Sequence, residues 1–136
     1  MSGSATTQDD AAIRKVLSSY ETALNAANTA AVMPLYTDDG VFMAPNFQSA
    51  IGKTALRQAY DAVFKAITLK VKFIIAELVM MSRQWAFVRT NSVGTQTVNA
   101  TGAESAEANQ ELFIFNKGGD GMWRIARYSF STTNPM

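Results

Sequence analysis

Two residues of this chain have the type and the setting that acid–base chemistry requires. Glu111 alternates with Phe113 and Phe115, so a strand here would place its carboxyl on a mainly apolar face. A carboxyl removed from water has a raised pKa and can donate a hydrogen bond at neutral pH. Tyr20 lies on the apolar side of an amphipathic segment, where its hydroxyl needs a polar partner or a cavity. Both residues are candidate catalytic groups. The alternative for Glu111 is an ion pair with an arginine, and the alternative for Tyr20 is packing in the core without a functional role.

The residue types that the chain lacks exclude several other kinds of chemistry. Its 136 residues include no Cys and no His, which removes thiol nucleophiles, Ser-His-Asp catalysis and the cysteine- or imidazole-based metal sites. The neighbouring acids Asp38 and Asp39 precede Gly40, a setting typical of a turn. No glycine-rich phosphate loop is present, so a nucleotide or nicotinamide is not expected. We expect neither a metal nor a cofactor.

Charge and hydropathy indicate a globular protein whose partner is a small molecule. The net charge is +1, with 48% hydrophobic and 17% charged residues. This balance gives no long-range attraction to nucleic acid or to an anionic membrane surface. The apolar runs are too short to cross a bilayer, and the N-terminal residues have no features of a secretory signal. The expected location is the cytoplasm.

The elements that must position Tyr20 and Glu111 come as helices first and strands second. Helical spacing predicts a first helix through Ile13–Ala27, a short second helix at Ala30–Tyr36 that Pro34 limits, and a third helix opened by Gly52. Residues rich in β-branched and aromatic types then predict four strands. These strands are Lys70–Met81, Gln84–Val98, Glu107–Asn116 and Met122–Thr132, after a brief earlier strand at Val41–Met43.

This order is typical of an α+β fold. We expect residues 1–8 to be a disordered tail and residues 9–136 to form a single domain. In that domain a strongly curved, cone-shaped antiparallel sheet wraps around the three N-terminal helices. Such a sheet leaves either a packed core or a pocket on its concave side.

Five segments follow a known order and spacing: Ser19–Ala26, Leu35–Phe42, Gly52-Lys53 at a helix start, Asn109–Phe115 and Gly121–Tyr128. Over roughly residues 9–133 they resemble the nuclear transport factor 2-like, or SnoaL-like, superfamily, and in particular its small ketosteroid isomerase-like members. The resemblance implies the same cone-shaped α+β fold. It does not imply one activity, because the superfamily holds isomerases, cyclases, dehydratases, transport factors and assembly modules.

Ketosteroid isomerases combine an Asp base, a Tyr donor and a protonated Asp donor. The resemblance implies that Tyr20 and Glu111 match the two donors, whereas Ala44 stands at the position of the base. A methyl group cannot accept a proton, which argues against steroid-type isomerisation. A cyclase or dehydratase with a base elsewhere on the rim would need another carboxylate, for which Asp61, Glu77 and Glu107 are available.

The neighbour of Glu111 depends on the register of the last hairpin. A four-residue loop, Gly118–Gly121, sets Glu111 opposite Tyr128, whereas a five-residue loop sets it opposite Arg127, whose charge would lower the pKa of Glu111. The resemblance favours the first register. In that register three residues face the pocket: Ala126, Tyr128 and Phe130.

The combined expectation is a homodimer, paired through its sheet, that binds a small apolar or amphipathic ligand with Glu111 and Tyr20 as orienting polar groups. The alternative is a non-catalytic assembly module whose cone is simply packed. The residues expected to line the pocket are mostly aromatic. They are Phe42, Phe47, Tyr60, Phe64, Trp85, Asn109, Phe113, Tyr128 and Phe130.

Overall fold

The computed structural model describes residues 3–135, and the side chains from residue 7 onward. The helices are α1 (Gly3–Asn25), α2 (Thr29–Val32) and α3 (Lys53–Ala66), with a 3-10 turn η1 (Met33–Leu35) after α2. The strands are β1 (Tyr36–Met43), β2 (Ala50–Ile51), β3 (Ile67–Met80), β4 (Trp85–Val98), β5 (Glu104–Lys117) and β6 (Trp123–Thr132). Within this part of the chain no helix is both long and apolar enough to cross a membrane.

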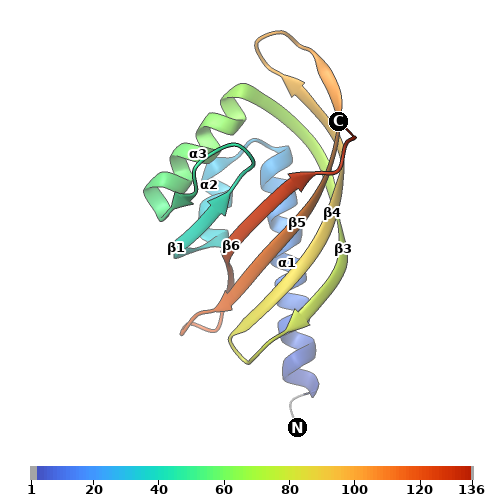
Figure 1. The fold of residues 1–136 in the computed structure, drawn as a ribbon. Coiled ribbons are helices and arrows are strands. Elements are labelled where there is room, and N and C mark those ends of the chain that lie inside the picture. Colours follow the sequence, from blue (N-terminus) through green and yellow to red (C-terminus); the bar gives the residue numbers. More distant parts are fainter. Residues whose placement is uncertain (1–2, 136) are drawn as a thin grey trace.

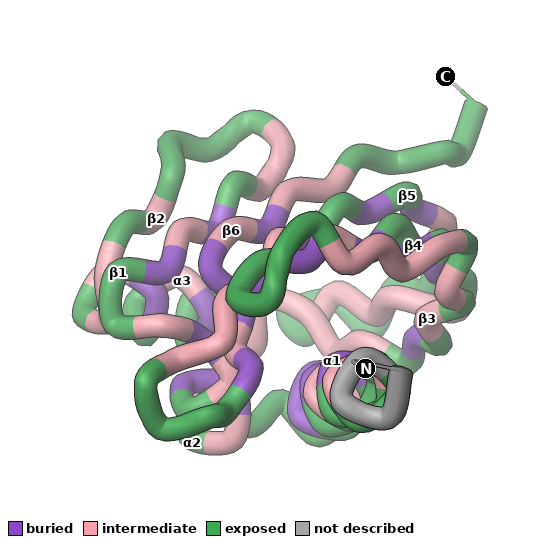
Figure 2. The backbone as a smooth tube through the Cα atoms, turned by 90° about the horizontal axis from the view of Figure 1, so that it is seen from below, coloured by how far each residue is buried: buried purple, intermediate pink, exposed green. Residues whose placement is uncertain are grey.

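The strands form one curved sheet in the order β2-β1-β6-β5-β4-β3. The three helices lie on its concave side, and the long strands β3 to β6 bend around α1 (Figures 1 and 2). This confirms the α+β, cone-like fold. One pairing differs from the antiparallel expectation, because β1 runs parallel to β6. The chain reaches β6 only after α3 and three further strands, so the sequence contains no local signal for that pairing.

Helix α1 begins at Gly3, so residues 3–8 are helical and not the disordered tail expected from the sequence, while residues 1 and 2 lie outside the described part. This end of the helix also makes a contact with residues far along the chain. One carboxyl oxygen of Asp9 accepts hydrogen bonds from Lys117 Nζ at 3.0 Å and from Trp123 Nε1 at 2.9 Å. The second turn of α1 is therefore bound to the β5–β6 hairpin through Asp9.

The predicted turn at Asp38-Asp39-Gly40 is part of strand β1. Pairing with β6 shifts register between Tyr36 and Val41, so these residues form an irregular stretch of the strand. Gly40 is needed there for space, since a Cβ at that position would lie 2.7 Å from the Tyr36 ring. Its carbonyl also accepts a hydrogen bond from the Gly52 amide at 2.9 Å. Glycine here allows Tyr36 to pack inward and does not reverse the chain.

The β5–β6 hairpin adopts neither predicted register. Lys117 pairs with Trp123 around a five-residue loop, and Glu111 lies opposite Phe130. Ala126 is an extra residue on β6, a β-bulge between the pairs formed by Ile125 and Arg127. The bulge restores the alternation, so the side chains of Tyr128 and Phe130 do share a face with Glu111. Ile125, and not Ala126, occupies the regular inward position before them, opposite Phe115.

Candidate functional site

A chain of tyrosine hydroxyls lies at the centre of the core. The Tyr60 hydroxyl of α3 is 2.6 Å from the Tyr20 hydroxyl of α1 and 2.7 Å from the Tyr36 hydroxyl of β1. The fourth tyrosine of the chain, Tyr128, stacks edge-on against Tyr20 with ring centroids 5.6 Å apart. Tyr20 also interacts through its hydroxyl with Tyr36 and Tyr128, so the four hydroxyls form one connected network.

These hydroxyls stay protonated and act as donors. Burial raises the pKa of Tyr20 well above its ordinary value, against the opposing effect of hydrogen bonds from Tyr60, Tyr36 and Tyr128. The negative charge of Glu111 raises the pKa of Tyr20 further. Burial likewise raises the pKa of each of the other three tyrosines. The cluster therefore offers O–H groups to an oxygen atom and does not supply a phenolate base.

Glu111 of β5 is 4% exposed and faces the same interior as the tyrosines. Its two oxygens accept hydrogen bonds from Thr90 Oγ1 at 2.5 Å and from Ser92 Oγ at 2.6 Å. Burial raises the pKa of Glu111, the two hydroxyl donors lower it, and the charge of Glu107 raises it again. The net direction is upward, which favours the neutral, proton-donating form. Arg127 does not form the alternative ion pair with Glu111, because its guanidinium donates hydrogen bonds to the carbonyl oxygens of Asp39 and Ala126.

A wall of stacked rings adjoins these polar groups. Phe42 lies nearly parallel to Tyr60 and to Tyr128, with centroid distances of 4.9 and 5.6 Å. Tyr128 in turn stacks on Phe113 at 4.1 Å. The structure thus brings together seven of the nine residues expected to line the pocket around one core. These are Phe42, Tyr60, Phe64, Asn109, Phe113, Tyr128 and Phe130.

Phe47 and Trp85 do not belong to this group, contrary to the expectation. Phe47 is 78% exposed in the connection between β1 and β2. Trp85 is 41% exposed at the start of β4, where its neighbour Ala86 is the buried residue. Inward and outward positions alternate along a strand, so the pattern that buries Ala86, Val88 and Thr90 turns Trp85 outward. Their large apolar side chains alone did not indicate which face they occupy.

Asn109 links the buried carboxyl to a second acid. Its Nδ2 donates to Glu107 Oε2 at 2.8 Å and lies 3.5 Å from Ser92 Oγ, the same oxygen that donates to Glu111. Glu107, Asn109 and Glu111 are alternate residues of β5 and so share its concave face. A polar strip therefore runs along β5 from the interior toward the end of the sheet. The sequence singled out Asn109 but not its bond to Glu107.

The residue at the expected base position has no acid–base capacity. Ala44 follows β1 and packs, partly buried, against the core. In the described residues, no group of three or more Asp, Glu, His or Cys side chains is placed to hold a metal ion.

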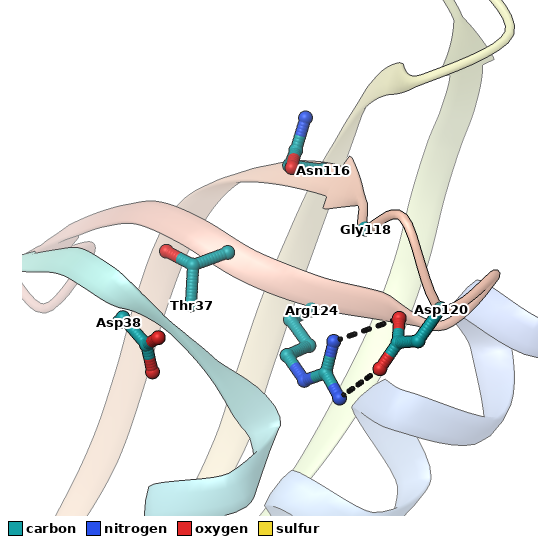
Figure 3. A pocket seen from close by; sticks show the side chains of 6 residues that line it. All are labelled: Thr37, Asp38, Asn116, Gly118, Asp120 and Arg124. Carbon is teal, nitrogen blue, oxygen red and sulfur yellow. Dashed lines mark hydrogen bonds and ion pairs between the residues drawn. The ribbon is translucent and has the colours of Figure 1, made fainter.

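A separate cavity of about 340 Å³ opens on the surface beside the β5–β6 hairpin (Figure 3). The Arg124 guanidinium there donates to both carboxyl oxygens of Asp120, at 3.2 and 2.7 Å. This internal pair balances the charges of Asp120 and Arg124, and the carboxyl of Asp38 also lines the cavity. The ion pair was not predicted from the sequence, although an acid and an arginine four residues apart around a hairpin turn indicate such a pair. The lining residues are Thr37, Asp38, Asn116, Gly118, Asp120 and Arg124.

The fold and these residues define a class of α+β proteins with a helix-filled, curved sheet. The chain belongs to the SnoaL-like domain family, whose model matches residues 16–127. It is similar to the ketosteroid isomerase-like protein from Erwinia carotovora atroseptica, with 42% identity, a TM-score of 0.88, and coverage of 92% of this chain and 96% of that one. No curated protein matches the sequence.

Two more distant structures share the fold alone. One is a nuclear transport factor 2-like protein with a cystatin-like fold from Novosphingobium aromaticivorans, at 18% identity, with a TM-score of 0.75 over 96% of this chain and 86% of that one. The other is a proposed scytalone dehydratase from the same organism, at 19% identity, with a TM-score of 0.79 over 95% of this chain and 87% of that one. These names differ in activity while the fold stays constant.

Proposed function

We propose that this protein binds a small, planar, largely apolar molecule on the concave side of its sheet and catalyses a proton transfer on it. One oxygen of the ligand would accept hydrogen bonds from Tyr20 and from protonated Glu111. The rest of the ligand would lie against the rings of Phe42 and Phe113. This chemistry needs hydrogen-bond donors with raised pKa values in a site protected from water, so that they stabilise negative charge on the ligand oxygen.

The observation that carries the proposal is the burial of Glu111 together with the linked hydroxyls of Tyr20, Tyr36 and Tyr60. Buried carboxyls are rare in proteins unless they are paired with a cation or serve a function. Glu111 accepts hydrogen bonds from the neutral hydroxyls of Thr90 and Ser92, and its charge raises the pKa of Tyr20. The similarity to a protein described as ketosteroid isomerase-like supports the same assignment.

The test is binding of 2-naphthol, a planar aromatic molecule with one oxygen at its edge, measured by isothermal titration calorimetry. We expect Tyr20→Phe and Glu111→Gln each to weaken binding about tenfold, since each removes a hydrogen bond to the ligand oxygen. Tyr36→Phe is the matched control, because it removes the same kind of hydroxyl from the far end of the tyrosine chain. Its binding constant should stay within about twofold of that of the wild type.

Equal affinity in all four proteins, or no binding at all, would contradict the donor assignment. That result would favour the alternative function, a non-catalytic assembly module in which the same rings are only a packed core. The melting temperatures of the four unliganded proteins show whether a variant binds more weakly because it lost a contact with the ligand or because it is less well folded.

We also propose that the protein forms a homodimer through the convex face of the sheet. The helices cover only the concave side, so the outer side chains of the central strands have no intramolecular cover (Figure 2). Ile74, Val93 and Leu112 are 51%, 50% and 43% exposed there. A face of long strands that combines apolar and polar side chains is typical of a surface that pairs with a second subunit.

A further inference from the structure

Strand β3 forms one lateral edge of the sheet, since the strand order places it next to β4 only. It is the outermost of the long strands, and α1 lies beside it (Figures 1 and 2). Every second residue of an edge strand points its backbone N–H and C=O groups away from the sheet, where a strand of another chain can pair with them. The opposite edge is β2, which has two residues. A strand that adds to this sheet therefore finds its longest template at β3.

The first part of β3 has the composition of a strand that pairs with copies of itself. Residues 67–75 (ITLKVKFII) contain no Pro and no Gly, and all but the two lysines are aliphatic, aromatic or β-branched. They pair one to one with residues 90–98 of β4, so this stretch is regular. Segments of this kind associate with identical segments, because the same side chains then pack against one another. The partner that this edge fits is the β3 strand of a second copy of the chain.

Two side chains of α1 occupy this edge in the place of a neighbouring strand. Asn25 Nδ2 donates a hydrogen bond to the Val71 carbonyl at 2.8 Å, and Asn25 Oδ1 accepts one from the Val71 amide at 2.8 Å. One side-chain amide thus makes the same two bonds that a residue of an adjacent antiparallel strand would make. One turn earlier on α1, Glu21 Oε1 accepts a hydrogen bond from the Phe73 amide at 2.7 Å. Because Val71 and Phe73 are alternate residues, these bonds block consecutive pairing positions of the edge.

Two lysines of β3 add charge to the same stretch. Lys70 and Lys72 are both exposed, and Lys70 Nζ donates a hydrogen bond to the Asn25 carbonyl at 3.0 Å. A lysine on an edge strand opposes association between identical chains, because like charges are then brought together. Lys70 therefore holds the end of α1 in place and also makes the edge less attractive to a second copy.

Beyond Phe73 the edge is protected in a different way. Among the described residues, the hydrogen bonds from α1 side chains to the β3 backbone end at Phe73. The pairing with β4 then passes from Ile75 to Glu77 and leaves Ala76 as a β-bulge. A bulge twists an edge and interrupts the row of backbone groups that a new strand would need. The regular part of the edge, which has no bulge, is thus the part that α1 covers.

We propose that Asn25 and Glu21 form an edge guard, which occupies the outward backbone groups of β3 and so prevents a second copy of the chain from adding its β3 strand there. The covered surface is a strand-pairing site for an identical chain. It consists of backbone groups at the side of the sheet, so it is distinct from the side chains of the convex face. A displacement of the last two turns of α1 exposes it.

The first measurement tests the bonds of the guard in solution, by amide hydrogen exchange of the isotope-labelled protein followed by NMR. In Asn25→Ala we expect the Val71 amide to exchange about tenfold faster or more than in the wild type, since it loses its hydrogen-bond acceptor. The Lys72 amide is the internal control, because it points toward β4, and its rate should stay within about twofold of that of the wild type. Equal Val71 rates in the two proteins would mean that Asn25 does not hold this edge, and the proposal would fail at its first step.

The second measurement is sedimentation velocity of the double variant Glu21→Ala/Asn25→Ala at low and high protein concentration. We expect its mass to exceed that of the wild type and to rise with concentration. The Val71 and Phe73 amides should exchange fast at low concentration and regain protection at high concentration, which locates the new contact at the edge of β3. Glu21→Gln keeps an oxygen for the Phe73 amide and should sediment as the wild type does.

Two further variants are controls for the double variant. Thr22→Ala removes an exposed hydroxyl of α1 that bonds to the Ser18 carbonyl, and Tyr36→Phe weakens the core without a change at the edge of β3. Both should keep the mass of the wild type at every concentration. If Tyr36→Phe associates as strongly as the double variant, the cause is a general loss of stability and the guard assignment fails. It fails equally if the double variant keeps the wild-type mass at every concentration.

Discussion

Tyr60 is the residue on which the hydroxyl cluster depends, since its oxygen is bonded to both Tyr20 and Tyr36. All three rings are almost completely buried, so none of these hydroxyls can use bulk water as a substitute partner. A buried polar group that loses its partner destabilises the fold by about 1–3 kcal/mol. Removal of the middle hydroxyl should therefore affect two other groups, and removal of an end hydroxyl only one.

Tyr60→Phe should lower the free energy of unfolding by about 2–4 kcal/mol, because two buried hydroxyls lose their partner at once. Tyr36→Phe, which removes one end of the chain, should lower it by about 1–2 kcal/mol. Urea denaturation followed by circular dichroism measures both values under the same conditions. Equal losses would show that Tyr20 and Tyr36 find each other when Tyr60 cannot bond them.

Glu111 should make the stability of the fold depend on pH in a defined direction. Its pKa is raised in the folded state, first by burial, so the folded protein holds this proton more tightly than the unfolded chain does. The associated stability is fully present below about pH 4.5 and is lost as the pH rises through the folded pKa. Glu111→Gln removes this dependence because an amide does not ionise.

We therefore expect the unfolding free energy of Glu111→Gln to increase relative to that of the wild type when the pH is raised from 5 to 8. Urea titrations of both proteins at the two pH values give the difference. A relative loss for the mutant at the higher pH would mean that the ionised carboxylate is the more stable form in the core.

At the scale of elements, the concave site depends on a close approach between β3 and β4. Gly94 pairs with Val71, and a Cβ on Gly94 would lie 1.9 Å from the Lys70 carbonyl oxygen. Its φ of 158° also differs from the ordinary strand values of residues with a side chain. The strands can pack and bend here only because this residue is glycine.

Gly94→Ala should destabilise the protein by about 2 kcal/mol or more, since the backbone of β3 must move away. Gly119→Ala in the β5–β6 loop is the control, because its added Cβ meets no atom within 4 Å. That variant should stay within about 0.5 kcal/mol of the wild type. Thermal unfolding of the two variants provides the comparison, and similar melting temperatures would disprove the close approach.

At the scale of the whole molecule, the proposed ligand site and the proposed dimer interface lie on opposite faces of the sheet. The concave face holds Glu111, Glu107 and the aromatic rings, whereas the convex face carries the exposed Ile74, Val93 and Leu112. Because adjacent residues of a strand point to opposite faces, a substitution on the convex face does not change the side chains of the concave face. The proposed assembly and the proposed ligand binding can therefore be tested by separate mutations.

We expect the wild type to sediment with the mass of two chains and Leu112→Lys to sediment as one. A lysine at that position would place a charge in the apolar part of the proposed interface, where it lacks a partner. Ala62→Lys on α3, also exposed, is the control and should leave the mass unchanged. The proposed interface is wrong if Leu112→Lys and the wild type have the same mass in sedimentation equilibrium.

Local patterns in the sequence were sufficient to predict the helices and strands and to identify Tyr20 and Glu111 as candidate site residues. Helical spacing from Ile13, the limit that Pro34 sets to the second helix and the alternation around Glu111 each depend on residues within a few positions of one another. These features predicted the order of helices and strands, and they placed Tyr20 and Glu111 on apolar faces that the structure buries. The family resemblance implied the same cone-shaped fold.

Contacts between distant segments decided the rest. Asp9 links α1 to Lys117 and Trp123, and the bulge at Ala126 sets which β6 residues face Glu111. The linkage of Glu107 to Glu111 through Asn109 and Ser92 requires the register of β4 with β5. A one-residue change of register reverses every side chain of a strand, and its energy depends on packing across the whole sheet. The sequence by itself thus determined which groups are available, and the tertiary structure decided which of them meet.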